Sequence, residues 1–379
     1  MADVQAMVQT LLDDLVGRGV ERGLQVAVYR DGDLIVDAWA GIADPATGRP
    51  VDGETLFTVF SSTKGITATV IHLLAERGAL DYDEPIATYW PEFAANGKER
   101  VTVRHALTHS AGIPQRPTDV PMTDWEGTCR AIAAMTPLWE PGTQFGYHAG
   151  TFGWILGELA RRVDGRPIKR IVAEDICAPL GIRSLFFGIP DDAELRVATL
   201  ENDPTITSAP APPPDSLLAR AMPGSREYFA MFNRPEVRRA VLPAGGGIMN
   251  ARSLARHYAA LVGDGVDGVR LLPPERVRIA TTLQTEARDV VLGLPIRRGL
   301  GYMLGRRISP MGARATAFGH AGYGGSLGFA DPQYGLAFAL TKNRLAFSAP
   351  GSSTVDTIAR TVRASLDIPD GDEEASPQG

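Results

Sequence analysis

Residues 55–64 read Thr-Leu-Phe-Thr-Val-Phe-Ser-Ser-Thr-Lys, and the architecture can be predicted outward from this stretch. Its first six residues are mostly β-branched or aromatic, which favours a short strand ending at Phe60. Beyond Lys64, apolar residues recur at the spacing of one helical face, at Ile66, Val70, Leu73 and Leu74, and Gly78 ends the pattern. The sequence therefore predicts a strand followed at once by a buried helix.

The first turn of that helix carries Ser61 and Lys64, which are three residues apart and therefore lie on one face. Serine is a weak nucleophile until a base lies beside it, and a lysine becomes a base when burial lowers its pKa. The N–H groups at a helix N-terminus can also bind an oxyanion. The alternative is structural, with Ser61 or Ser62 as a helix N-cap and Lys64 in solvent. Taken alone, the tetrad is compatible with both interpretations.

Size and composition indicate a two-lobed globular protein. At 379 residues the chain exceeds what one hydrophobic core usually holds. A hydrophobic content of 44% with 22% charged residues is typical of a folded protein rather than a disordered one. A net charge of -6 without any basic run argues against nucleic acid as a partner.

The N-terminal segment and the cysteines favour a cytoplasmic protein. Residues 1–16 form an amphipathic helical pattern and lack the basic start and unbroken apolar stretch of a signal peptide. No stretch approaches the ~20 apolar residues of a membrane span. Cys129 and Cys177 lack metal-ligand spacing and are expected to be free thiols. We expect no membrane partner, no metal and no cofactor.

Strand patterns lie at both ends of the chain and helical patterns lie between them. Residues 24–29 and 34–39 flank a turn and predict a β-hairpin. The later strand-like segments are 300–304, 315–318, 326–330 and 335–341, and a helix is expected around residues 355–366. This order predicts the α+β class: an antiparallel sheet flanked by helices, built from residues 1–80 and 244–368, with a mainly helical lobe over 81–243. A cleft between the lobes is the expected site.

Two segments lie outside this plan. Residues 203–216 are rich in proline and are predicted to form a surface loop that shapes the entrance of the cleft. Residues 369–379 are acidic and are expected to form a disordered tail.

Two further motifs can complete an active site around Ser61. Tyr147 lies in a loop just before a helical pattern, where a phenol close to the lysine ammonium can carry the proton that the lysine shares. The glycine-rich run 319–325 lies between two strands, and a backbone N–H after Gly322 can join that of Ser61 in an oxyanion hole. The structural alternatives are a core tyrosine and an ordinary glycine-rich hairpin.

A competing nucleophile motif, G-x-S-x-G, is present at residues 324–328. In α/β-hydrolases this motif requires a helix directly after the serine and a histidine later in the chain. Ser326 is followed instead by a turn and a strand pattern, and no histidine follows it. We therefore interpret Ser326 as structural, and we assign His72, His105, His109 and His257 to the scaffold as well.

Taken together, these segments resemble the serine β-lactamase-like superfamily of penicillin-recognising enzymes, most closely its class C-like members, the family VIII carboxylesterases. The matching motifs occur in order: residues 61–64, residues 108–112, Tyr147, the triplet 245–247 and residues 320–322. The resemblance implies Ser61 as nucleophile, Lys64 as its base and Tyr147 as proton shuttle. It also implies an oxyanion hole made of the backbone N–H groups of Ser61 and Tyr323.

Two motifs depart from the family pattern and bear on the substrate. The family's Tyr-x-Asn has alanine in its third position here and His148 in its second, so the amide that positions a peptide or lactam carbonyl is missing. The family's Lys-Thr-Gly reads His320, Ala321 and Gly322, which removes a permanent cation suited to a carboxylate. We expect these four residues to line the substrate site, and the changes favour neutral esters over β-lactams and acidic peptides.

The leading hypothesis is a serine hydrolase that cleaves small neutral carboxylic esters through an acyl-enzyme on Ser61. An acyltransferase of a biosynthetic pathway would use the same acyl-enzyme with an alcohol or amine as acceptor. A β-lactamase, a D-amino peptidase or an amidase ranks third. A binding protein that keeps the fold without the chemistry would be expected to lose Ser61, Lys64 or Tyr147, and all three are present.

Overall fold

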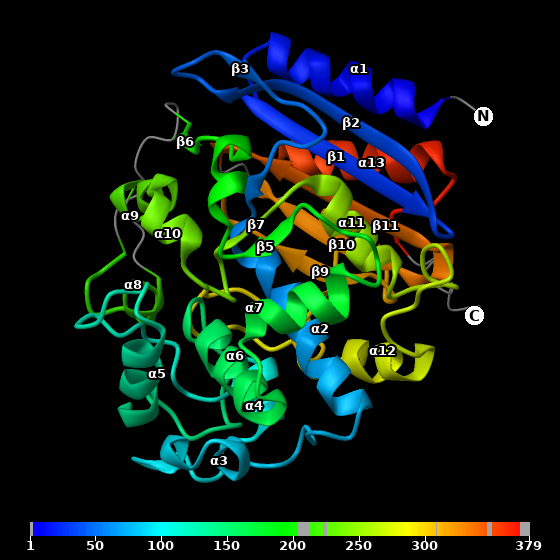
Figure 1. The fold of residues 1–379 in the computed structure, drawn as a ribbon. Coiled ribbons are helices and arrows are strands. Elements are labelled where there is room, and N and C mark those ends of the chain that lie inside the picture. The colour runs from blue at the N-terminus through cyan, green and yellow to red at the C-terminus, as the bar shows by residue number, and fades with distance from the viewer. Residues whose placement is uncertain (1–2, 204–211, 223–225, 308, 347–350, 372–379) are drawn as a thin grey trace.

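The computed structural model describes residues 3–203, 212–222, 226–307, 309–346 and 351–371. Within these ranges the two ends of the chain build one antiparallel sheet of seven strands, in the order β3-β2-β1-β11-β10-β9-β8 (Figure 1). Its strands are β1 (Gly23–Arg30), β2 (Asp33–Asp44), β3 (Arg49–Pro50), β8 (Met303–Leu304), β9 (Phe318–Ala321), β10 (Leu327–Asp331) and β11 (Leu336–Lys342). The expected hairpin and the α+β class are confirmed.

Strands from opposite ends of the sequence meet at the centre of the sheet. β1 pairs with β11, with Val26 opposite Leu340, so the first strand and a strand more than three hundred residues later share one ladder. Both strands are buried almost throughout, because helices cover the sheet on both faces. The sheet therefore fixes the N-terminal and C-terminal parts of the chain relative to each other.

Helices from distant parts of the chain cover the two faces of the sheet (Figure 1). The helices α1 (Val4–Gly17) and α13 (Thr354–Ser365) pack on one face, against side chains such as Val26 and Val28. On the other face lie α2 (Thr63–Glu76) and α11 (Ala251–Ala259), with α12 (Pro274–Thr281) beside α2. The alternation along β1 explains this division, since Ala27 and Tyr29 point to the second face.

The helix α2 is buried on all sides. Every residue from Thr63 to Ala75 is buried, as expected for a helix in the middle of a large core rather than on its surface.

The strand predicted over residues 55–60 is shorter than expected: β4 covers only Phe57–Thr58. Phe60 then adopts a positive φ of 45°, and a 3-10 turn, Phe60–Ser62, redirects the chain into α2. Strand propensity was overridden here because the chain must turn within a few residues.

The central stretch of the chain is mainly helical. Its helices are α3 (Ile86–Tyr89), α4 (Val103–Leu107), α5 (Trp125–Ala134), α6 (Thr151–Asp164), α7 (Ile168–Ile171), α8 (Leu217–Ala221), α9 (Arg226–Ala230) and α10 (Pro235–Arg239). The helix α6 packs against α2 and so joins this stretch to the sheet. Of the proline-rich segment 203–216, residues 204–211 lie outside the described residues.

Short strands of the central stretch pair with strands from both ends of the sequence. β5 (Leu185–Phe187) and β4 flank β7 (Gly247–Met249) in a small antiparallel sheet, and β6 (Glu201–Asn202) pairs with β12 (Arg344–Leu345).

The acidic tail was expected to begin at residue 369, but the structure describes the chain as far as residue 371. Asp370 forms an ion pair with Arg363, and Gly371 forms a bridge with Ala313, whereas residues 372–379 lie outside the described residues.

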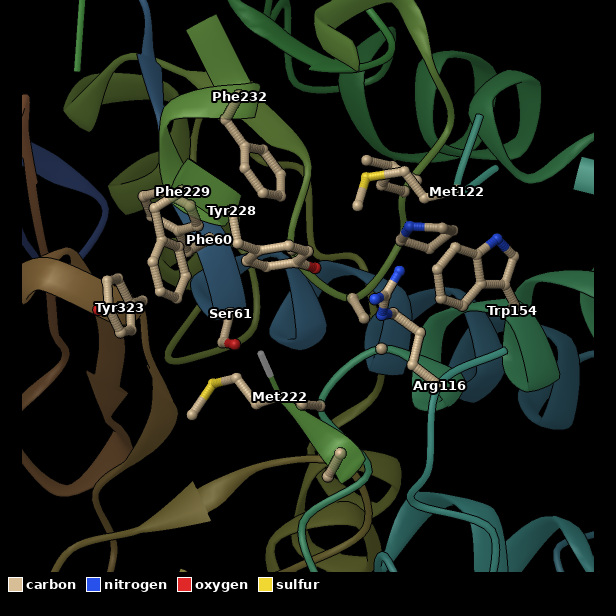
Figure 2. A pocket seen from close by; sticks show the side chains of 17 residues that line it. Phe60, Ser61, Arg116, Met122, Trp154, Met222, Tyr228, Phe229, Phe232 and Tyr323 are labelled. Atoms are coloured by element: carbon tan, nitrogen blue, oxygen red, sulfur yellow. The ribbon is translucent and has the colours of Figure 1, made fainter. Parts of the chain in front are cut away.

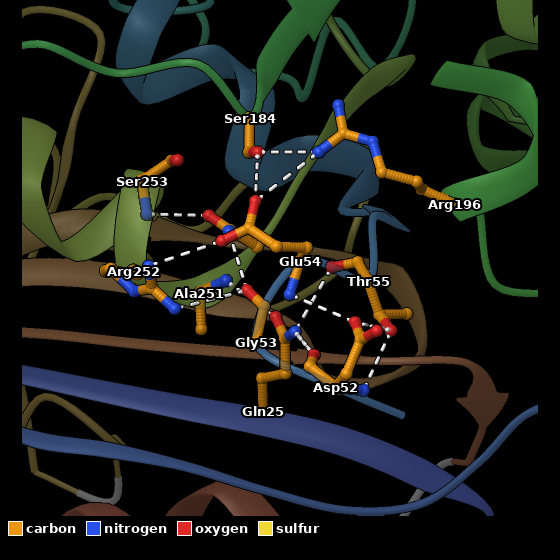
Figure 3. Close-up of polar contacts among 11 residues, drawn as sticks. Gln25, Asp52, Gly53, Glu54, Thr55, Ser184, Arg196, Ala251, Arg252 and Ser253 are labelled. Atoms are coloured by element: carbon orange, nitrogen blue, oxygen red, sulfur yellow. Dashed lines mark hydrogen bonds and ion pairs between the residues drawn. The ribbon is translucent and has the colours of Figure 1, made fainter. Parts of the chain in front are cut away.

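The loop that leads into β4 is held by side chains from β1 and from the start of α11 (Figure 3). Gln25 of β1 donates to the carbonyl oxygens of Asp52 and Thr55, at 2.6 and 3.1 Å, and accepts from the backbone of Ala251 at 3.0 Å. Asn250 donates to the carbonyl of Gly53 at 3.0 Å. These bonds fix the path of the chain just ahead of Ser61.

None of the helices in the described ranges has the length and apolar composition needed to cross a membrane.

Candidate active site

Ser61 and Lys64 meet on one face at the start of α2, as their spacing predicts. The Lys64 Nζ lies 3.2 Å from the Ser61 Oγ. The same amine donates to the carbonyl oxygens of Ala149 and Ala244, each at 2.8 Å. Ser61 is partly exposed, whereas the Lys64 side chain is fully buried. This arrangement excludes the alternative in which Lys64 faces solvent.

The environment of Lys64 favours a neutral amine. Burial lowers the pKa of Lys64 well below its ordinary value, because none of the described carboxylates offsets the lost hydration. A neutral amine has two N–H groups and one lone pair, and the two carbonyl oxygens can only accept hydrogen bonds. With both N–H groups directed at Ala149 and Ala244, the lone pair is left for the hydroxyl of Ser61. Lys64 is therefore placed to take the Ser61 proton.

Tyr147 is the third member of the cluster. Its ring centroid lies 4.9 Å from the Lys64 Nζ, and its side chain is buried. Burial raises the pKa of Tyr147 to about 12, and a side-chain hydrogen bond with Ser61 offsets part of this effect. The phenol is thus protonated at neutral pH and can donate its proton to a group bound at Ser61. The structure brings together all three residues that the sequence singled out as candidate catalytic groups.

A buried ion pair behind Tyr147 was not foreseen from the sequence. The Asp289 Oδ1 accepts hydrogen bonds from the backbone N–H groups of Tyr147 at 3.1 Å, Val291 at 2.9 Å and Leu292 at 2.8 Å. Its Oδ2 accepts from the Arg298 guanidinium at 2.6 Å, and both side chains are buried. Asp289 therefore ties the Tyr147 loop to the segment before β8. Neither residue belongs to a motif, so the sequence carried no signal for this pair.

Replacing Asp289 by Ala is expected to lower the free energy of unfolding by about 3–5 kcal/mol, because Arg298 is left as an uncompensated buried charge. Urea unfolding followed by circular dichroism measures this loss. The matched control is Glu275→Ala, which breaks an exposed ion pair with Arg278 and should leave the unfolding midpoint unchanged. Equal stability of the two variants would contradict the anchoring role of Asp289.

The end of β9 approaches the turn before Ser61 very closely. A side chain at Gly322 would collide with the Val59 carbonyl oxygen and with the Ser326 Oγ, so only glycine allows this contact. Ser326 is buried and its hydroxyl donates to the carbonyl of Val59 at 2.7 Å. The hydroxyl of the competing motif is therefore used to fasten β10 to the turn that carries Ser61.

The two residues expected to form the oxyanion hole face a common pocket. Ser61 lies in the 3-10 turn ahead of α2, and Tyr323 opens the 3-10 turn Tyr323–Gly325 after β9. Both line the same pocket, and the Tyr323 ring centroid lies 5.8 Å from that of Phe60. N–H groups at the start of such turns are available to ligands, which suits the expected role of the two backbone amides.

The four expected substrate-site residues occupy different environments. His320 is buried 6.2 Å from the Tyr147 ring, and burial lowers its pKa to about 3, so the imidazole is neutral. Ala321 is exposed and Gly322 is half-buried at the end of β9. His148 does not fit the expected contact with substrate. Its Nε2 accepts from the backbone of Ile113 at 3.0 Å and its Nδ1 bonds the Gly146 carbonyl at 2.6 Å, which makes it a structural residue.

A pocket opens beside Ser61 (Figure 2). Most of its described wall is apolar. The lining residues include six aromatic side chains and two methionines: Phe60, Trp154, Tyr228, Phe229, Phe232, Tyr323, Met122 and Met222. Phe229 stacks on Tyr323 with ring centroids 3.5 Å apart. Such a surface suits an apolar portion of a small molecule.

Comparisons with known proteins agree with this geometry. A family model described as Beta-lactamase matches residues 8–362. The chain is 39% identical over 338 residues to Esterase/beta-lactamase LipL of Mycobacterium tuberculosis (strain ATCC 25618 / H37Rv), covering 85% of this chain and 77% of the relative.

Solved structures give the same result over nearly the full length. The structure of a family VIII carboxylesterase matches with a TM-score of 0.85 and 33% identity, covering 95% of this chain and 98% of the other. A penicillin-binding protein homolog from Caulobacter crescentus matches with a TM-score of 0.85 and 35% identity, covering 96% and 97%. The protein is a carboxylesterase-type serine hydrolase. By sequence and by fold, the chain belongs to the beta-lactamase family.

Proposed function

We propose that this hydrolase cleaves carboxylic esters through an acyl-enzyme on Ser61. The observation that carries the proposal is the buried Lys64 amine, held by two carbonyl oxygens with its Nζ 3.2 Å from the Ser61 Oγ. A serine with a neutral amine at hydrogen-bond distance has the activating base that nucleophilic catalysis requires. Ser326, by contrast, has its hydroxyl occupied by a backbone carbonyl.

The proposed reaction follows from the positions of the three side chains. Lys64 takes the Ser61 proton as the Oγ attacks the ester carbonyl, and the backbone N–H groups of Ser61 and Tyr323 stabilise the oxyanion. Tyr147 gives its proton to the leaving alcohol and regains one from Lys64. Water then enters, is deprotonated by the same groups and releases the acid. Asp289 holds the Tyr147 backbone in place during both halves of the cycle.

The surroundings of the reacting carbonyl favour esters that are uncharged next to the scissile bond. The position that resembles a family lysine is occupied by His320, a buried neutral imidazole, and the next side chain is Ala321. Neither can hold a carboxylate as an ammonium does. The relative LipL is named for both esterase and β-lactamase activity, so nitrocefin is the reference substrate against which simple esters should be preferred.

A fluorophosphonate probe tests the nucleophile directly, because it reacts with an activated serine and leaves a stable adduct. We expect peptide mass spectrometry to place the adduct on Ser61. A simple ester such as p-nitrophenyl butyrate should slow the labelling, since it competes for the same hydroxyl. An adduct on Ser326, or none at all in an enzyme that turns over the ester, would refute the proposal.

A further inference from the structure

The pocket beside Ser61 contains one charged residue among the described residues that line it, and that residue is Arg116. Arg116 lies in the loop between α4 and α5, where its backbone N–H donates to the carbonyl of Arg220 at 3.1 Å and so fixes the loop against α8. Its side chain is half-buried. A permanent cation is energetically unfavourable in an otherwise apolar pocket unless an anion pairs with it, because the charge loses hydration there.

Among the described residues, the Arg116 side chain contacts the Tyr228 ring and donates no hydrogen bond. The guanidinium carbon lies 5.6 Å from the centroid of the Tyr228 ring, over its face. A cation–π contact uses the charge of the guanidinium and occupies none of its N–H donors. Within the described part of the chain, Arg116 forms no ion pair with a carboxylate. In Figure 2 the Tyr228 side chain lies between Ser61 and Arg116, with its hydroxyl end toward the guanidinium.

The pocket lies on the acyl side of the proposed reaction. Its lining includes Ala149 and Ala244, whose carbonyls hold Lys64, together with the glycines that follow them. Tyr147, the proposed proton donor to the leaving alcohol, is not among its described lining residues. The alcohol must lie next to Tyr147 to receive the proton. Because Tyr147 does not line this pocket, we assign the pocket to the acyl chain.

We propose that Arg116 binds a carboxylate at the far end of the acyl chain, so that the preferred substrates are monoesters of dicarboxylic acids. The apolar and aromatic walls would contact the methylene groups between the ester and the carboxylate. One guanidinium matches one carboxylate in charge and in its paired N–H donors. This proposal rests on ester hydrolysis at Ser61, and it is compatible with a site that is uncharged at the scissile bond because the anion is remote from it.

Matched pairs of substrates test the proposal in the intact enzyme. p-Nitrophenyl hydrogen adipate and hydrogen suberate carry the terminal carboxylate, and p-nitrophenyl hexanoate and octanoate have the same carbon chains without it. In Arg116→Gln we expect kcat/KM for the better of the two anionic esters to fall about tenfold, mainly through KM, because a charged hydrogen bond is lost. The neutral esters should change by less than about twofold. Arg116→Lys should restore part of the loss because it keeps the charge.

Arg130→Gln is the matched control, since Arg130 is an exposed arginine of α5 whose only described ion pair is with Glu126. It should leave all four rates unchanged. An Arg116→Gln variant that lowers anionic and neutral rates by the same factor would overturn the proposal. If that variant does not fold, salt is the second test: in the wild-type enzyme, sodium chloride should raise KM for the anionic esters only. Equal KM changes for both classes would also overturn it.

These outcomes separate this inference from the proposed function. In one case hexanoate hydrolysis depends on Ser61, but kcat/KM for the anionic esters does not change in Arg116→Gln. This result would refute the carboxylate site and leave the proposed ester hydrolase intact. Hexanoate hydrolysis that survives Ser61→Ala would instead remove the proposed function on which the inference rests.

Discussion

Replacing Ser61 by Ala is expected to lower kcat for p-nitrophenyl butyrate at least ~10⁴-fold, because the proposed covalent intermediate can no longer form. The variant should fold normally, since Ser61 is partly exposed and its Oγ contacts only the catalytic groups. Initial rates of p-nitrophenol release measure the loss, and circular dichroism checks the fold. The residual rate of the variant should reflect only substrate binding and the oxyanion hole.

Ser326→Ala is the matched control for this experiment, because it removes the hydroxyl of the competing motif. We expect its kcat to stay within about tenfold of wild type, together with a loss of about 1–2 kcal/mol in the free energy of unfolding, because the Val59 carbonyl loses a buried donor. Retained activity in Ser61→Ala with loss in Ser326→Ala would reverse the assignment of the nucleophile.

The Lys64 amine should set the acid limb of the pH–rate profile. Lys64 must be neutral to take the Ser61 proton, and burial lowers its pKa well below the ordinary value. As the pH falls through this lowered pKa, the protonated fraction grows and kcat/KM should fall tenfold per pH unit. Lys64→Met should lose about 10²–10⁴-fold in kcat and lack this limb. Lys64→Arg should be equally inactive, because a guanidinium does not give up its proton.

The variant Tyr147→Phe tests whether Lys64 or Tyr147 gives rise to the acid limb of the pH–rate profile. The pKa of Tyr147 is raised to about 12, so the phenol does not titrate in the acid range. The variant should therefore be slower at every pH but keep the position of the acid limb. If the limb disappeared in Tyr147→Phe and persisted in Lys64→Met, the roles of base and proton donor would have to be exchanged.

Local patterns were enough to predict most regular elements. The hairpin β1–β2 follows from alternation on both sides of a turn, and α2 follows from apolar residues at helical spacing. Strand limits were less accurate where propensity and pairing disagree. Residues 315–318 were expected to form a strand, but β9 covers Phe318–Ala321 and so includes Gly319 and Ala321, which are weak strand formers. Pairing with β10 outweighs their propensity.

The spacing of Ser61 and Lys64 followed from the sequence, because residues three apart on a helix share a face whatever surrounds them. The burial of Lys64 and its two carbonyl partners were decided by the tertiary structure. Ala149 and Ala244 lie 85 and 180 residues from Lys64, and a backbone carbonyl has no side-chain signature by which it could be recognised. The same holds for Asp289, which reaches Tyr147 across 142 residues. The sequence thus specified the reacting groups, whereas long-range packing set the pKa of Lys64, because desolvation depends on everything that encloses the amine.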